Sequence, residues 1–196
     1  MNDSTTAGAQ PLAGVRVIEF CHVAAGPFCG LLLADLGADV VKVEPRQGDA
    51  LRQWPPITQG FSENFASLNR NKRSIALNLK DADDKNVACQ LIRHADVVIE
   101  NNRPGVMARL GLGYEDFAET RPDLIYCSMS AFGQSGPRAQ QGGFDVTIQG
   151  ISGIMSVTGE PDGAPVKCGV PLSDFSAGLY AAFAVSSVLA RVRAGG

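Results

Sequence analysis

The stretch L12-A-G-V-R-V-I-E-F-C-H-V-A-A-G-P-F-C-G-L-L-L-A-D-L-G-A-D-V-V-K-V-E-P-R46 decides the fold of this chain. It predicts a buried strand, a turn, an apolar helix that ends at Gly37, and a second buried strand. This order is a β-α-β unit, which favours a right-handed crossover and a parallel sheet. Ligands of such sheets bind at the carboxyl ends of the strands, so the turn at 21–27 is expected to face a ligand.

The alternation of strands and helices continues along the chain. The pattern predicts strands at 74–79, 95–100 and 123–130, a helix with one polar face at 81–94, a helix that includes 115–119, and a helix at 144–155. We therefore expect an α/β, Rossmann-like open and mostly parallel sheet with helices on both faces. This domain would cover residues 12–196, after a polar N-terminal tail at 1–11.

Composition agrees with one α/β domain and argues against nucleic acid as a partner. Hydrophobic residues make up 45% of the 196 positions, enough to bury a substantial core. The formal net charge is −3 and no long run of Lys or Arg occurs, whereas nucleic-acid binding favours a basic patch.

Several features predict a reduced, cytoplasmic protein without a membrane partner. The N-terminus has neither a basic start nor an apolar core, so no secretory signal is expected. The apolar run at 177–190 is interrupted by serines and too short to span a bilayer, so we expect a buried helix. The cysteines are odd in number and widely spaced, which argues against a disulfide framework: Cys21, Cys29, Cys89, Cys127 and Cys168.

Metal and nucleotide motifs are missing from the sequence. There is no C-x-x-C, and His22 and His94 are the two histidines, so we expect no metal site. Glu44 at the end of the second strand resembles the acidic ribose ligand of nicotinamide-binding folds. The glycine patterns of dinucleotide-binding loops and P-loops are absent, however, which argues against both interpretations.

Asp174 precedes an apolar segment, within the motif P-L-S-D-F-S-A-G at residues 171–178. Taken locally, an Asp before a hydrophobic helical run is most often a helix N-cap. Other segments of the chain open a second interpretation, in which the carboxylate is a nucleophile.

Five blocks, in order, carry a resemblance to a known family. They are L-x-G-V-R-V-x-E-F at 12–20 with H-V-x-A-G-P at 22–27; L-G-A-D-V-V-K-V-E at 36–44; N-R-N-K-R-S-I-A-L-N-L-K at 69–80; A-D-V-V-I-E-N at 95–101 with P-G-V-M-A-R-L-G at 104–111; and G-F-D at 143–145 with L-S-D-F-S-A-G at 172–178. Together they resemble the class III CoA-transferases, which include formyl-CoA and carnitine CoA-transferases and the related α-methylacyl-CoA racemases. Several blocks in family order are more specific than any single motif.

The resemblance implies that coenzyme A or an acyl-CoA is bound as a substrate, with no tightly bound cofactor. The implied contacts are Val23, Ala24, Ala25, Arg46, Leu77, Lys80, Asn101, Asn102, Arg109 and Asp145. Two positions depart from the family pattern: Asn102 replaces a residue that is often aromatic, and Pro45 takes a place where arginine can occur. The basic run 70–73 offers further cations for phosphates, although a solvated surface is the simpler interpretation for Arg70 and Arg73.

Asp174 matches the catalytic aspartate of the family. The resemblance implies that its carboxylate attacks an acyl-CoA, passes through a mixed anhydride and then carries CoA as an aspartyl thioester. We further expect backbone donors after Asp174 to stabilise an oxyanion, and the helix start to keep its carboxylate ionised. His22 lies in the first turn, where either a chemical role or a structural hydrogen bond is possible.

Three alternatives remain open at this point. Racemases carry a histidine where this chain has Phe144, which cannot move a proton, so transfer is preferred over racemisation. Family members are about twice as long and form interlocked dimers, so this chain resembles an N-terminal half. A non-catalytic CoA-binding fragment is therefore the remaining alternative.

Overall fold

The computed structural model describes residues 10–195, so most of the proposed tail at 1–11 lies outside the described residues. Five strands form one parallel sheet in the order β5-β2-β1-β6-β7. They are β1 (Arg16–Phe20), β2 (Asp39–Glu44), β5 (Lys72–Ala76), β6 (Val97–Glu100) and β7 (Ile125–Ser128). Two short strands, β3 (Ile57–Thr58) and β4 (Phe61–Ser62), form a separate antiparallel hairpin. The predicted α/β class is confirmed.

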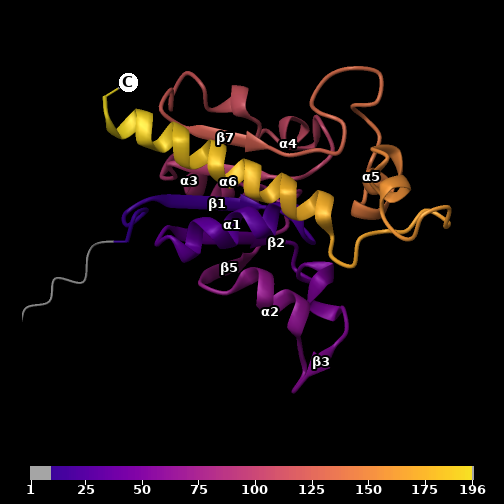
Figure 1. Cartoon of the computed structure of the whole chain (residues 1–196). Helices are drawn as coiled ribbons and strands as arrows, with labels where there is room; N and C mark the ends of the chain where they lie inside the picture. Colours follow the sequence, from indigo (N-terminus) through magenta and orange to yellow (C-terminus); the bar gives the residue numbers. More distant parts are fainter. Residues whose placement is uncertain (1–9, 196) are drawn as a thin grey trace, which may run out of the picture.

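Helices cover both faces of the sheet. In Figure 1, α1 (Ala25–Asp35) and α6 (Leu172–Arg193) lie in front of the strands and α3 (Ala82–Arg93) lies behind them. Alternate residues of each strand point to opposite faces. Val17 of β1 therefore packs in the cluster that contains α1 and α6, whereas Ile18 packs in the cluster that contains α3 and α4 (Val106–Arg109).

The ends of α1 and α3 follow the sequence signals. At the end of α1, Gly37 has a φ of +100°, its N–H donates to Ala34 O, and the N–H of Ala38 donates to Leu33 O. These two bonds form a Schellman motif, which favours glycine because other residues resist positive φ. Asp81 caps α3 by accepting from the N–H groups of Asp83 and Asp84 at 3.0 and 3.1 Å.

Other expected elements differ from the prediction. Only a 3₁₀ turn forms near 115–119 (Tyr114–Asp116), and the helix expected at 144–155 is broken at Gly153 into α5 (Asp145–Ile151) and a 3₁₀ turn (Ile154–Val157). Gly153 has a φ of +83°, which ends a helix. Strand β5 starts two residues earlier than expected, and β7 at the sheet edge is half-buried rather than buried. The remaining elements are α2 (Glu63–Asn69) and a 3₁₀ turn (Ala50–Gln53).

Helix α6 is longer and more exposed than expected. It has 22 residues, so by length and composition it is able to cross a bilayer, contrary to our estimate for the run at 177–190. One side packs in the core through Ala181, Ala182 and Val185. On the other side Tyr180 and Phe183 are 75% and 69% exposed, so the expectation of a buried helix was wrong.

Helices α1 and α6 approach each other closely at Gly178. A Cβ atom at this position would lie 2.5 Å from the carbonyl oxygen of Ala25 and 3.0 Å from the ring of Phe28. Phe28 also packs on Phe175, with ring centroids 4.7 Å apart. Since Asp174 lies one turn before Gly178, this contact fixes the start of α6 against the start of α1.

We predict that Gly178→Ala lowers the free energy of unfolding by about 1–3 kcal/mol, because the backbone oxygen of Ala25 cannot yield without moving α1. Gly150→Ala is the matched control, since a Cβ there would meet only the sulfur of Met155 at 3.6 Å. Urea denaturation of both variants checks this. Equal stability losses in the two variants would contradict the close-packing argument.

Candidate active site

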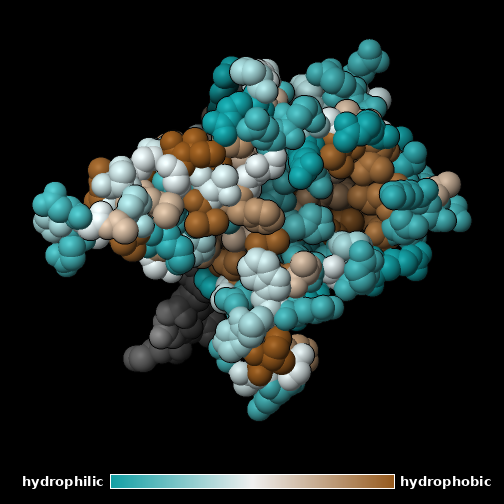
Figure 2. Space-filling model, turned by 90° about the vertical axis from the view of Figure 1, so that its right-hand side faces the viewer, coloured by the Kyte–Doolittle hydropathy of each residue, from teal (hydrophilic) through white to brown (hydrophobic). Residues whose placement is uncertain are grey.

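The candidate site lies where the chain order of the sheet reverses. From β1 the chain continues to β2 on one side, whereas β6 and β7 lie on the other side of β1. In open parallel sheets ligands bind outside the carboxyl ends of the strands at such a point. These ends lie at the right of Figure 1, and Figure 2 looks onto that side, where apolar residues line hollows between hydrophilic ones.

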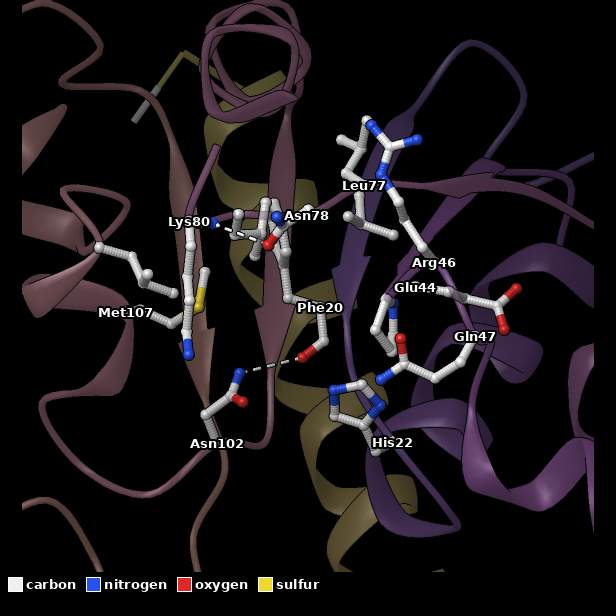
Figure 3. A pocket seen from close by; sticks show the side chains of 14 residues that line it. Phe20, His22, Glu44, Arg46, Gln47, Leu77, Asn78, Lys80, Asn102 and Met107 are labelled. Carbon is white, nitrogen blue, oxygen red and sulfur yellow. Dashed lines mark hydrogen bonds between the residues drawn. The ribbon is translucent and has the colours of Figure 1, made fainter. Parts of the chain in front are cut away.

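A cleft of about 530 Å³ opens at the ends of β1, β2 and β6. Four of the predicted CoA contacts line it: Arg46, Leu77, Lys80 and Asn102. Figure 3 shows Lys80, Asn102 and Met107 on one side, Arg46 and Gln47 on the other, and His22 at one end. The mixture of apolar walls and a few cationic or amide groups suits a nucleotide-containing ligand.

A second cleft of about 300 Å³ brings four more of the predicted contacts together with Asp174. Val23, Ala24, Ala25 and Asn101 line it with Asp174 itself. His22 lines both clefts, so the two adjoin at this side chain. A third hollow also contains Val23, Ala24 and Asp174, together with Asp145.

Arg109 and Arg46 were both predicted to contact CoA, but neither points into a cleft without qualification: Arg109 lies outside the clefts, and Arg46 is paired with another residue. Arg109 is exposed at the end of α4, whose Met107 lines the larger cleft, but Arg109 lines none of these three hollows. The guanidinium of Arg46 pairs with Asp84 at 2.7 Å, and its side chain is 66% exposed. Surface pairs of this kind are weak, so Arg46 remains available to a ligand.

Amide side chains fix the turn between β1 and α1. Asn101 accepts from the N–H of His22 and donates to its carbonyl, both at 2.9 Å. Asn102 donates to the carbonyl of Phe20 at 3.2 Å, while its own N–H donates to Glu100 at 2.8 Å. The two predicted ligand contacts therefore also tie the turn after β1 to the end of β6.

Asp174 is the third residue of α6, not its N-cap. The cap residue is Pro171, so the local N-cap interpretation was wrong. Asp145 from α5 takes the capping role instead, because its carboxylate accepts from the N–H of Ser173 at 2.8 Å and of Asp174 at 3.4 Å. Gln149 holds the same carboxylate at 2.6 Å.

This arrangement bears on two expectations about the site. The N–H groups of Ser173 and Asp174 bind Asp145, and the first N–H after Asp174, that of Phe175, donates to the carbonyl of Pro171 at 3.0 Å, so it is not the free oxyanion donor that we expected. Burial, and next the charge of Asp145, raise the pKa of Asp174 from 3.8 to about 6. The carboxylate is therefore still mostly ionised at pH 7, as expected, although its charged form is less favoured than that of an exposed aspartate.

His22 and Ser173 are two further polar residues of the cleft that contains Asp174. Burial lowers the pKa of His22 below its ordinary value of 6.5, so the imidazole is neutral at pH 7. The hydroxyl oxygen of Ser173 is buried and has no hydrogen-bond partner among the described residues. An unpartnered buried hydroxyl next to a cleft is free to bind a ligand.

The basic run at 70–73 does not reach either cleft. It lies at the amino-terminal end of β5, whereas the clefts open at the carboxyl ends of the strands. Arg70 pairs with Asp35, Arg73 pairs with Asp39 at 2.6 Å, and Lys72 is buried against Glu19. These cations are structural, and the solvated-surface interpretation of Arg70 and Arg73 was right.

Glu44 is likewise occupied by protein contacts. Although its burial opposes ionisation, hydrogen bonds from Arg52, from Ser74 and from the N–H of Asp49 lower its pKa to about 2. The nicotinamide-type role that its position resembled therefore has no free carboxylate to use.

Sequence reasoning missed three buried charges beneath the turn. Lys42 lies between Glu19 and Asp49, at 3.0 Å from each carboxylate, and all three side chains are at most 1% exposed. Glu19 and Lys42 stand inside otherwise apolar strands, and this interruption of a buried run was the available signal.

No group of residues within 10–195 has the composition and proximity of a metal site. All five cysteines are free, in agreement with the sequence expectation.

Comparison with known proteins gives the family. The model of CoA-transferase family III matches residues 12–196. The succinate–glutarate CoA-transferase of Agrobacterium fabrum is 46% identical, over 91% of this chain and 47% of that protein. The acetyl-CoA:oxalate CoA-transferase of Acetobacter aceti is 45% identical, over all of this chain and 51% of that protein. A CAIB/BAIF family protein from Brucella suis has a TM-score of 0.91 at 43% identity, over 96% of this chain and 51% of that chain.

The chain belongs to CoA-transferase family III. It spans about half the length of the curated relatives it matches.

We predict that Asp174→Asn stabilises the protein at pH 8 but not below pH 4. With a folded pKa of about 6, the folded state binds more protons than the unfolded state between pH 4 and 6. Stability contributed by this group therefore falls as the pH rises through that window. The gain at pH 8 is about 1–2 kcal/mol after allowance for the partial exposure of the carboxylate.

Urea unfolding at both pH values measures the effect. Asp123→Asn is the control, because hydrogen bonds from Arg121 lower the pKa of Asp123 and its loss should give no such gain. If Asp174→Asn stabilises the protein equally at pH 3.5 and pH 8, the pKa of the Asp174 carboxylate is not raised.

Proposed function

We propose that this chain carries the CoA-binding and nucleophilic part of a CoA-transferase that moves CoA from an acyl-CoA to a carboxylic acid. The observation that carries the proposal is that the Asp174 carboxylate opens on the same cleft as the turn between β1 and α1. Family membership supports the reaction class, and the named relatives are CoA-transferases.

The proposed reaction uses Asp174 as the covalent nucleophile. Its carboxylate attacks the thioester carbonyl and expels CoA thiolate, which leaves a mixed anhydride. The thiolate then attacks the aspartyl carbonyl, releases the first acid and leaves an aspartyl thioester. The second acid attacks the aspartyl carbonyl of this thioester and expels CoA thiolate, which leaves a second mixed anhydride. The thiolate then attacks the acyl carbonyl of that anhydride, which forms the new acyl-CoA and releases the Asp174 carboxylate.

The raised pKa of Asp174 suits this role. With a pKa of about 6, the carboxylate is mostly ionised at neutral pH, yet it is more basic than an exposed aspartate. A more basic and partly desolvated carboxylate is a better nucleophile. Burial also limits the access of water, which would hydrolyse the anhydride and the thioester.

The two adjoining clefts give a natural placement for the substrate. The adenine and phosphates would occupy the larger cleft with Leu77, Lys80 and Arg46, and the thioester would extend past His22 to Asp174. The Ser173 hydroxyl would bind a carboxylate or carbonyl oxygen of either acid. His22, neutral at pH 7, would serve as a hydrogen-bond partner rather than as a charge.

Transfer is favoured over racemisation by Phe144. This side chain is 71% exposed and lines the Asp174 cleft. Racemisation needs a proton acceptor and a proton donor on opposite faces of the α-carbon, and a phenyl ring is neither.

The acids and the assembly belong to the same proposal. Relatives named for succinate, glutarate and oxalate make short dicarboxylic acids the first candidates. We also propose a cytoplasmic location and, for a longer chain, an interlocked homodimer. In the non-catalytic alternative, the chain binds CoA but forms no covalent intermediate.

We predict that incubation with succinyl-CoA or acetyl-CoA gives a CoA-sized, hydroxylamine-labile adduct on this chain. Asp174→Ala should give none and should keep its affinity for CoA within about threefold, because the carboxylate does not bind the nucleotide. Intact-mass spectrometry and calorimetry provide the two measurements. CoA binding without any adduct would favour the non-catalytic alternative, and an adduct that persists in Asp174→Ala would exclude this residue as the nucleophile.

We further predict that Lys80→Ala weakens CoA binding about tenfold, which corresponds to the loss of one charge-assisted phosphate contact. Lys85→Ala, an exposed lysine on α3 outside the larger cleft, is the matched control. Calorimetric titration with CoA compares them. If both variants bind as the parent does, the larger cleft does not hold the phosphates.

A further inference from the structure

The turn between β1 and α1 contains a strained residue. Val23 has a φ of +62°, in the left-handed region that β-branched residues avoid. Such a conformation is energetically unfavourable and persists only where the surroundings enforce it. The strained residue lines both hollows that contain Asp174.

Asp49 provides the enforcing contact. Its carboxylate accepts from the N–H of Val23 at 3.3 and 3.4 Å and from the N–H of Leu51 at 3.0 Å. The side chain of Asp49 is fully buried, so water does not compete for these bonds. Asp49 thus connects the turn to the 3₁₀ helix Ala50–Gln53, of which it is the N-cap.

Lys42 stabilises the charge of Asp49 and also donates a hydrogen bond to the same turn. Its ammonium group lies 3.0 Å from Asp49 and 3.0 Å from Glu19, and it donates to the carbonyl of Cys21 at 2.7 Å. Burial opposes the charge on Lys42, but Glu19 and Asp49 outweigh this effect and raise its pKa. A lone buried carboxylate would be costly, whereas this paired one is stable and rigid.

We infer that Asp49, with its charge compensated by Lys42, is a positioning residue for the chemistry at Asp174. It holds Val23 in the left-handed conformation, and the turn then forms the wall of the Asp174 clefts at Val23 and Ala24. Asp49 touches neither cleft itself, so it acts through the backbone of the turn. This inference rests on the proposed function and deepens it.

The test compares two changes at Asp49. Asp49→Ala removes the acceptor for the Val23 N–H, and Asp49→Asn keeps an acceptor of the same shape but removes the charge that faces Lys42. Arg121→Met is the matched control, since Arg121 also fixes backbone carbonyls, those of Arg93 and Ala95, but at the opposite end of β6 from the site.

Two readouts separate positioning from general stability. The rate of CoA-adduct formation with succinyl-CoA should fall about 100-fold in Asp49→Ala, because a displacement near 1 Å at a reacting group has an effect of this size. The fall should be smaller in Asp49→Asn, and CoA affinity should change less than about threefold in both. Hydrogen exchange in the peptide that contains Val23 should become faster in Asp49→Ala. Arg121→Met should leave the adduct rate and this exchange unchanged, even if it lowers thermal stability as much as Asp49→Ala does.

Each other outcome has a definite meaning. Faster exchange with an unchanged adduct rate overturns the inference, because the turn would then be structural only. An equal fall of the adduct rate in Arg121→Met overturns it as well. If the parent forms no adduct at all, the proposed function fails for this chain. Hydrogen exchange then still tests whether Asp49 holds the turn. Unchanged exchange in Asp49→Ala rejects that role, and faster exchange supports it.

Discussion

The buried ammonium group of Lys42 is the constraint on which the site depends. It compensates Glu19 and Asp49, which would otherwise be costly to bury, and it holds the carbonyl of Cys21. Because Lys42 stands on β2 and Glu19 on β1, the pair also ties the two central strands together behind the turn. An apolar residue at position 42 would leave Asp49 without its buried cationic partner, whereas Glu19 would keep only Lys72, at 2.8 Å.

The larger features of the fold were predictable because they follow from local patterns. Continuous apolar runs gave the strands, Gly37 gave the end of α1, and Asp81 gave the start of α3. The strand ends then placed Lys80, Asn101 and the turn near one another. The helix expected at 144–155 was wrong because an apolar run at helical spacing does not reveal that Gly153 takes a positive φ.

The electrostatics of Asp174 were not predictable from its neighbours in sequence. A carboxylate in the first turn of a helix is normally favoured in its charged form. Here Asp145, 29 residues earlier in the chain, occupies the N–H groups of that turn and adds a like charge. Only the three-dimensional placement of α5 shows that the cap and the candidate nucleophile are different residues, and that burial and then the charge of Asp145 raise the pKa of Asp174.

The contacts that form the site join distant parts of the chain, which has a consequence for the order of folding. Asn101 reaches the turn across 79 residues, and Gly178 meets Ala25 from near the end of the described chain. Contacts of this length are slow to form because a long loop must close first, and the pairing of β1 with β6 is of the same kind. During synthesis the turn can therefore gain its contact with Asn101 only after β6 has been made. Asp174, which lies later in the chain, comes to the cleft last. A nascent chain that ends before α6 would expose the apolar residues of α1 that α6 covers, and exposed apolar surface of this kind favours aggregation.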